Sequence, residues 1–352
     1  MEIGIEEEPY TSRLQITLHG LPSDRKINLF GNKMIAVRDG ILEMHGEKPL
    51  LTWTRLAKTC IKGDQQIILL ENAGWKVGQT IVIATTSYKT DESEQRIIIS
   101  VTPDGKTLFL DRPLDHTHIS VVETYSSKKL PMQAEVGLLS RNIVFRGDPE
   151  TSVANSYGAH IMLHSASDSH TSQARIEHVE LYNVGQAFKL GRYPIHFHIM
   201  GEVHESYVRG NSIYDTYNRA VTLHAVKYLK IEDNIVFNTN GHGFFTEDAI
   251  ETNNYITNNL AIQIKSSWSL LASDISPSAY WIKNPNNYLN SNAAAGSDGH
   301  GFWYDLSSHP TGPSSTKSIC PRNEKLGSFA HNSAHSVKKY ALRVHHGHSP
   351  RT

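Results

Sequence analysis

One heptapeptide pattern occurs twice in this chain, as Gly241-His242-Gly243-Phe244-Phe245-Thr246-Glu247 and as Gly299-His300-Gly301-Phe302-Trp303-Tyr304-Asp305. Each copy begins seven residues after an asparagine, and each asparagine follows an apolar residue by three. The same opening occurs six times, ending at Asn142, Asn211, Asn234, Asn259, Asn292 and Asn332, with spacings of 69, 23, 25, 33 and 40 residues. The basic unit is therefore close to 23 residues, with insertions. Short repeats rich in Asn and Gly, without a helical period, predict the coils of a parallel β-solenoid.

Each repeat predicts a corner followed by a strand. We expect the asparagine to turn inward at the corner and to bond backbone groups of its own coil and the next, because Asn tolerates the left-handed backbone that corners need. His242 and His300 lie between glycines at the following bend, where we expect a structural role. In the strand beyond, alternate side chains face the core and the outer surface.

Residues 1–135 have a different sequence pattern from the repeat. Short apolar strands alternate with turn signals, and Asp104-Gly105 predicts a tight hairpin turn. Trp75, ahead of one strand, is expected in a local core. We therefore predict an all-β chain with a small β-rich domain over residues 1–135 and a parallel solenoid over 136–352. The last repeat reaches residue 352 without a capping element, which predicts that the chain is a fragment of a longer protein.

Composition limits the classes of partner. A net charge of −1 predicts no standing attraction for nucleic acid or anionic lipid. The 20 histidines have two interpretations: they make the chain cationic in an acidic compartment and so allow it to bind a polyanion, or they are polar filler on a β surface. Cys60 and Cys320 predict neither a disulfide framework nor a metal knuckle. The sequence contains no secretory signal and no apolar run long enough for a transmembrane helix.

Chemistry is expected on the outer face of the repeated strand. In each coil, the residues eleven and thirteen positions after the asparagine are expected to point outward from the core. In successive coils these pairs are Thr222 and His224, Phe245 and Glu247, Trp303 and Asp305, and Arg343 and His345. If one coil has a six-residue insertion, His196 and His198 join the same two columns. Because neighbouring coils are about 4.8 Å apart, His198, His224 and Glu247 should stack, with His196 beside them.

Two reactive uses of this surface remain open. His196, His198 and His224 are enough to hold a divalent metal, zinc or calcium, which would polarise a sugar carboxylate or activate water. Alternatively, Glu247 and Asp305 form a carboxylate pair about 9.6 Å apart across two coils, near the upper limit of the ~6.5–9.5 Å found in inverting glycosidases. A third interpretation is a column that only decorates the sheet.

Aromatic and basic side chains next to these acids suit an acidic sugar polymer. Phe245 and Trp303 would stack against sugar rings, and Arg343 would bind a uronate carboxylate. Arg192, just before the His-x-His pair, is a second candidate for the same role.

Several motifs in order resemble one family: Arg192-Tyr193-Pro194-Ile195-His196-Phe197-His198, Asn218-Arg219-Ala220-Val221-Thr222-Leu223-His224, Phe245-Thr246-Glu247-Asp248, Asn284-Pro285-Asn286-Asn287 and Pro310-Thr311-Gly312-Pro313-Ser314. They are similar to fibrocystin, fibrocystin-L and the cell-surface or secreted hyaluronan-degrading proteins. The resemblance covers most of residues 40–345. It implies an eight-glycine β domain followed by a right-handed parallel β-helix.

The resemblance also implies function, and its two branches differ. The hyaluronan-degrading branch implies cleavage of hyaluronan or a similar acidic polysaccharide, with Glu247, Asp305 and His224 as catalytic candidates. The fibrocystin branch implies a non-catalytic receptor or adhesion module. Both imply an extracellular or cell-surface protein, in contact with a membrane only through segments outside this chain.

Overall fold

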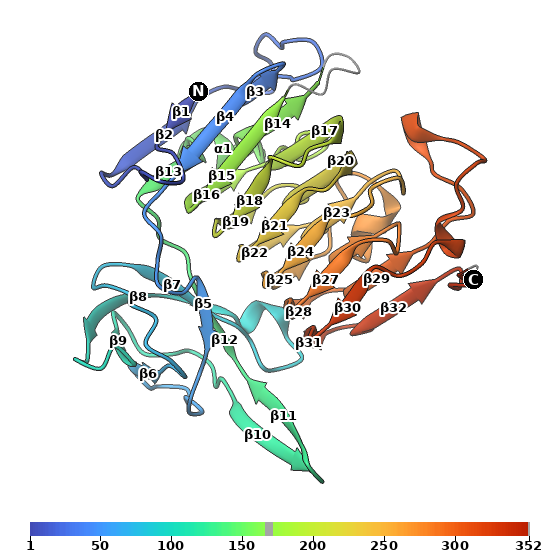
Figure 1. Ribbon diagram of the computed structural model, residues 1–352. Coiled ribbons are helices and arrows are strands. Elements are labelled where there is room, and N and C mark those ends of the chain that lie inside the picture. Colours follow the sequence, from blue (N-terminus) through green and yellow to red (C-terminus); the bar gives the residue numbers. More distant parts are fainter. Residues whose placement is uncertain (166–171, 351–352) are drawn as a thin grey trace.

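The computed structural model describes residues 1–165 and 172–350, which form a parallel β-helix with an antiparallel β domain beside it (Figure 1). Three parallel sheets of eight strands wrap around one core. The first consists, in order, of β1 (Glu2–Ile3), β4 (Ile41–His45), β15 (Gln173–Glu177), β18 (Tyr207–Arg209), β21 (Lys230–Glu232), β24 (Tyr255–Thr257), β27 (Tyr288–Asn290) and β30 (Ser328–Ala330).

The other two sheets follow the same progression along the helix axis. The second consists of β2 (Leu14–Leu18), β13 (Ile143–Gly147), β16 (Val179–Val184), β19 (Ser212–Thr216), β22 (Ile235–Asn240), β25 (Leu260–Lys265), β28 (Ala293–Ser297) and β31 (Ser333–Val337). The third consists of β3 (Met34–Arg38), β14 (His160–His164), β17 (Ile195–Glu202), β20 (Val221–Lys227), β23 (Phe244–Thr246), β26 (Ser278–Ile282), β29 (His300–Asp305) and β32 (Leu342–His345).

The antiparallel domain is a separate six-stranded sheet with a protruding hairpin (Figure 1). Its order is β5 (Trp53–Arg55), β12 (Glu135–Leu138), β7 (Thr80–Ile83), β8 (Glu94–Val101), β9 (Thr107–Leu110) and β6 (Gln66–Ile68), and the hairpin is β10 (Ser120–Tyr125) with β11 (Lys128–Gln133). Asp104-Gly105 turns β8 into β9 as expected, and Trp75 is buried in the local core. The described helices are short: η1 (Thr90–Glu92), α1 (Pro149–Asn155), η2 (Ala272–Ile275), η3 (Gly312–Ser314) and η4 (Pro321–Asn323).

The strand pairing divides the chain differently from the expected boundary at residue 135. Strands β1 to β4, within residues 2–45, already belong to the three solenoid sheets. In the second sheet Leu14 pairs in parallel with Ile143, so the chain resumes the solenoid directly beside its first coil. The antiparallel domain, residues 53–138, is therefore an insertion after that coil. The asparagine repeat begins only at Asn142, so the sequence pattern did not reveal the first coil.

The antiparallel domain packs against the second sheet. Val82 of β7 and Ala84 just after it share a buried cluster with Ile235 and other residues of the solenoid. The indole of Trp53 donates to the carbonyl of Asn258 at 2.9 Å, and His335 pairs with Glu135 at 2.7 Å. These contacts hold the insertion on the face that β22, β25 and β28 contribute.

The repeated asparagines form a buried ladder along one corner. The side-chain oxygen of Asn234 accepts from the backbone and side-chain N–H groups of Asn211 at 3.0 Å, and Asn259 accepts from Asn234 in the same way. Asn292 and Asn332 continue the series. The inward orientation is as expected, whereas the left-handed backbone falls on the residue before each asparagine of the ladder from Asn211 to Asn332, such as Asp233 with φ 59°.

Stacking of adjacent coils requires glycine at two positions of the repeat, Gly243 and Gly301. A Cβ on Gly243 would lie 2.6 Å from the carbonyl oxygen of Ala279 on the adjacent coil, and one on Gly301 would lie 2.6 Å from that of Ala341. A side chain at either position would thus collide with the neighbouring backbone.

None of the helices within residues 1–165 and 172–350 has the length and apolar character that crossing a bilayer requires.

Candidate functional site

The third sheet brings the expected histidines together. His196 and His198 on β17 pair in register with Thr222 and His224 on β20, so the proposed six-residue insertion is confirmed. The backbone N–H of Glu247, just after β23, donates to the carbonyl of Leu223 at 3.0 Å. This bond extends the register by one coil and stacks Glu247 on His224.

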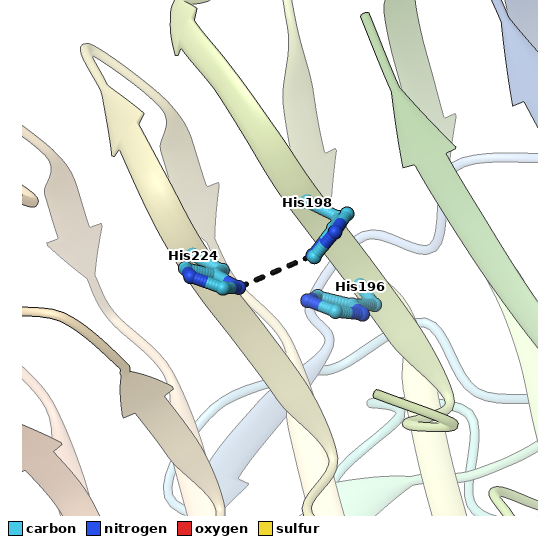
Figure 2. Close-up of side chains that lie close together, drawn as sticks. All are labelled: His196, His198 and His224. Atoms are coloured by element: carbon cyan, nitrogen blue, oxygen red, sulfur yellow. Dashed lines mark hydrogen bonds between the residues drawn. The ribbon is translucent and has the colours of Figure 1, made fainter. Parts of the chain in front are cut away.

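The three imidazoles face one another across two strands (Figure 2). The Nδ1 atoms of His198 and His224 lie 3.1 Å apart, and one ring nitrogen of each histidine lies within 4.8 Å of the others. The rings of His196 and His224 are parallel, with centroids 6.1 Å apart. Two nitrogens on one tetrahedral zinc are about 3.3 Å apart, given Zn–N distances of about 2.0–2.1 Å. Small ring rotations would therefore suffice for a common ion.

Outer contacts select which nitrogens face this centre. His196 Nδ1 lies 2.9 Å from the carbonyl oxygen of Gly191, which can only accept, so Nδ1 carries the hydrogen. His196 Nε2 is then a lone-pair atom, and it is buried without a hydrogen-bond partner among the described residues. His224 Nε2 lies 2.9 Å from Asp248 Oδ2, which leaves Nδ1 for the centre. Metal-binding histidines are typically oriented by a carbonyl or carboxylate of this kind.

Burial and mutual charge act on the histidine pKa values. Burial and the neighbouring histidines hold the pKa of His196 well below its usual value, and the same causes lower the pKa of His198 to about 3. Burial also lowers the pKa of His224, but its hydrogen bond to Asp248 and the charge of Glu247 outweigh this, so that pKa is raised. Neutral imidazole is the form that binds metal, and two of the three rings are held in it.

The donor set discriminates between the two expected ions. Three imidazole nitrogens suit zinc and related transition ions, whereas calcium takes six to eight oxygen ligands. On the inner side of the rings, Glu247 Oε2 lies 3.6 Å from His224 Nδ1 and has no hydrogen-bond partner among the described residues. The residues therefore fit a zinc-type ion and not calcium.

Asp248, to which sequence reasoning gave no role, is braced from three sides. Both oxygens of the buried Glu251 carboxylate accept backbone N–H groups, from Ala225 and Asp248 on one oxygen and from Ala249 on the other. The backbone of Thr311 donates to the carbonyl of Asp248 at 2.9 Å, and the N–H of Ser314 lies 3.3 Å from Oδ2. Asn284 donates to the carbonyl of Ala249. The loops that contain Asn284 and Thr311 thus support the partner of His224.

Glu247 and Asp305 lie two strands apart, as expected. Continuing the register of β26 places Lys283 between them. Burial raises the pKa of Glu247, which favours its protonated form. Asp305 Oδ1 instead lies 3.1 Å from His345 Nδ1. The catalytic pair remains a prediction, and the imidazole centre includes Glu247 alone.

The expected stacking surface is covered. Phe245 and Trp303 point away from the solenoid core, but their exposed fractions are only 4% and 8%, and with Trp281 they form their own buried cluster. The guanidinium of Arg219, held by Asp274, lies 3.9 Å from the centroid of the Phe245 ring. Arg343 lies 4.2 Å over Trp303. The expectation that sugar rings stack directly on Phe245 and Trp303 is therefore wrong for this conformation, and Arg343 is engaged with an indole.

His242 and His300 have matching roles. The ring of His242 stacks on Phe245 with centroids 5.2 Å apart, and His300 packs edge-on against Trp303 at 4.3 Å. Both rings are fully buried. Each therefore covers the aromatic residue that follows it by three in the repeat.

Arg192 lines a pocket beside the imidazole centre. The pocket has a volume of about 160 Å³, and its other lining residues are Lys26, Gly31, Tyr157, Gln186, Phe188, Lys189 and Leu190. The lining thus contains three cations and no acid. No carboxylate among the described residues pairs with Arg192, and burial lowers its pKa. Because the Gly191 carbonyl binds His196, this pocket and the centre share one short segment.

Some of these residues had a weak signal in the sequence. Strand alternation would place Asp248 on the core side, but β23 ends at Thr246, so alternation does not apply beyond it. Lys283 and Trp281 belong to a coil whose long insertion hides its register. The continuous apolar run within Ser278–Ile282 was the available indication of that strand.

Comparisons with known proteins agree with the resemblance. A family model described as the CEMIP beta-helix matches residues 156–342, and a model of the G8 domain matches residues 1–57. Fibrocystin-L of Homo sapiens is 38% identical over 380 residues, which cover 98% of this chain and 9% of that protein. The cell surface hyaluronidase CEMIP2 of Homo sapiens is 32% identical over 338 residues, covering 82% of this chain and 23% of that protein. The chain thus spans a minor part of these relatives.

A solved structure gives a much weaker match. The Gp54 tailspike of Acinetobacter baumannii bacteriophage AP22, in complex with capsular saccharide, has 12% identity and a TM-score of 0.23, covering 96% of this chain and 66% of that chain. Similarity at this level carries no argument here. The CEMIP beta-helix model, in contrast, matches 187 of the 352 residues. This chain belongs to the CEMIP β-helix family.

Proposed function

We propose that this chain binds an acidic polysaccharide of the hyaluronan type at the outer face of its third sheet and cleaves it with the aid of a zinc-type ion. The observation that carries the proposal is the set of three imidazoles with preset nitrogens beside the unpartnered Glu247 oxygen. The name of the relative CEMIP2, a cell surface hyaluronidase, supports the substrate class and a cell-surface setting.

The residues have separate roles in this proposal. His196, His198 and His224 would hold the ion, and the Gly191 carbonyl and Asp248 would orient two of them. A bound ion of this type supplies a Lewis acid for a sugar carboxylate, or a water of lowered pKa. Glu247 would act as general acid or base, because its Oε2 faces the centre and makes no hydrogen bond. Arg192, with Lys26 and Lys189, would bind a uronate carboxylate in the adjacent pocket.

Size analysis of high-molecular-mass hyaluronan tests this function. The protein is incubated with the polymer at pH 5 and pH 7, with added Zn²⁺ or with a chelator. We expect shortening with Zn²⁺ and none with chelator. Glu247→Gln should slow the reaction by a factor of about 10²–10⁴, the usual range for an acid–base residue. His204→Ala, at a side chain with 59% exposure on another face, is the matched control and should behave as wild type.

The alternative function is a non-catalytic receptor or adhesion module, as in the fibrocystin branch. Lys283 between Glu247 and Asp305 favours it, since a cation separates the two candidate carboxylates. Polymer that stays intact under every condition while binding is measurable would support the module and exclude the enzyme. Absence of both cleavage and binding would contradict the polysaccharide assignment itself.

A further inference from the structure

A second cluster of metal-ligating side chains lies at the far end of the third sheet. Asp305 on β29 and His345 on β32 are partners in the strand register, and His346 follows directly. Asp305 Oδ1 lies 3.1 Å from His345 Nδ1 and 3.6 Å from His346 Nδ1. One ligand atom of each residue lies within 4.8 Å of the other two.

The backbone brings both histidines to one side. Neighbouring residues of a regular strand point to opposite faces, so His345 and His346 would normally diverge. His346 instead has a φ of 68°, a left-handed conformation that is uncommon for a residue with a side chain. The two ring centroids are consequently only 3.8 Å apart.

A hydrogen-bond network does not account for this convergence. His345 is within hydrogen-bond distance of the Asp305 oxygen, whereas His346 Nδ1 at 3.6 Å lies outside it and makes no hydrogen bond of its own among the described residues. Two nitrogens and one oxygen therefore face a common point. Lys283 is the cation next to Asp305 in the strand register, and its ammonium group donates a hydrogen bond to the hydroxyl of Thr311 at 3.0 Å.

We infer that Asp305, His345 and His346 form a second divalent-metal site, independent of the imidazole centre. Two imidazoles and one carboxylate are a donor set that zinc and ferrous iron accept in sites with open positions. The side chains are partly exposed, with fractions of 21%, 40% and 48%, so open positions would face solvent or a ligand. Three strand spacings separate the site from His224, or about 14 Å at ~4.8 Å per strand.

Zinc stoichiometry tests this site. The chain is loaded with Zn²⁺, passed through a desalting column and analysed for tightly held metal. We expect two ions per chain in the wild type, one in His346→Ala and one in His198→Ala, which removes a ligand of the first centre. Asp305→Asn provides a second variant of the new site and should also retain one. His348→Ala, whose ring bonds the Glu324 carbonyl, is the matched control and should retain two.

Other outcomes would overturn the inference. Two ions retained in both His346→Ala and Asp305→Asn would place the second ion elsewhere. A single ion in the wild type that persists in His346→Ala would show that only the first centre binds. Equal loss in His348→Ala would indicate unspecific binding to the histidine-rich tail. None of these counts depends on hyaluronan, so failure of the proposed function would leave this test intact.

Discussion

His224 Nε2 lies 2.9 Å from Asp248 Oδ2, and this bond aims the other ring nitrogen of His224 at His198. The carboxylate comes from the loop after β23, which is held by the Glu251 side chain within the loop, by the backbone N–H of Ser314 and by the side chain of Asn284. The orientation of one imidazole is thus set by coils beyond its own. Residues that orient a ring in this way, such as Asp248, are therefore suitable positions for substitution.

Asp248→Asn should weaken zinc binding while the fold persists. The amide keeps the size of the side chain but removes the negative charge that favours the required tautomer of His224. Loss of such an outer contact typically costs 10–100-fold in metal affinity. Competition with a chromophoric chelator would measure this, with circular dichroism as the control for folding. Unchanged affinity would show that Asp248 does not orient the ring.

Asn234→Ala should destabilise the solenoid strongly. The change leaves the N–H of Asn211 and the carbonyl of Val208 buried without their partners. Each such group costs about 1–3 kcal/mol, so we expect a loss of about 2–6 kcal/mol in the free energy of unfolding. Asn240→Ala, which removes one partly buried bond to the Thr216 carbonyl, is the comparison and should cost less. Equal losses in urea denaturation would argue against a structural ladder.

The His335–Glu135 pair predicts a pH-dependent interface between the solenoid and the antiparallel domain. Burial lowers the pKa of His335, but the nearby Glu135 carboxylate outweighs this and raises that pKa above 6.5. The stabilisation that protonated His335 gives to the folded state is therefore complete below pH 6.5, and it is lost as pH rises through the raised pKa. Despite burial, His335 and Arg55 lower the pKa of Glu135 below 4.5, so its contribution is lost only as pH falls through that lower value. The pair therefore stabilises fully between pH 4.5 and 6.5.

His335→Gln tests this dependence, because glutamine stays neutral at every pH. The difference in unfolding free energy between wild type and variant should be larger at pH 6 than at pH 9. Urea denaturation at both values measures it. A difference that does not change with pH would mean that the charge of His335 contributes nothing.

Arg192→Gln should weaken hyaluronan binding roughly 10- to 150-fold, since a charge-assisted hydrogen bond contributes about 1.5–3 kcal/mol. The effect should shrink at high salt, where exposed charges are screened. Arg112→Gln, at a 58% exposed side chain on the antiparallel domain, is the matched control. Binding is measured on a surface that carries the immobilised polymer. Equal effects of the two substitutions would indicate general electrostatic attraction and not a pocket.

The sequence predicted the features that repeat and missed those that occur once. The ladder at Asn234 and the stacking of His198 on His224 follow from a fixed coil length, so counting residues was sufficient. Coverage of Phe245 and Trp303 could not be read from a pattern, because it depends on Arg219 and Arg343, which reach over the rings from other coils. The first coil was missed because it lacks the asparagine and precedes a long insertion.

The central claim is that His196, His198 and His224 bind one metal ion. Anomalous diffraction at the zinc absorption edge, from crystals of the zinc-loaded protein, tests it most directly. The account predicts a peak about 2.0–2.1 Å from Nε2 of His196 and from Nδ1 of His198 and His224. Absence of a peak between these rings, with the 3.1 Å contact between His198 and His224 retained, would contradict it.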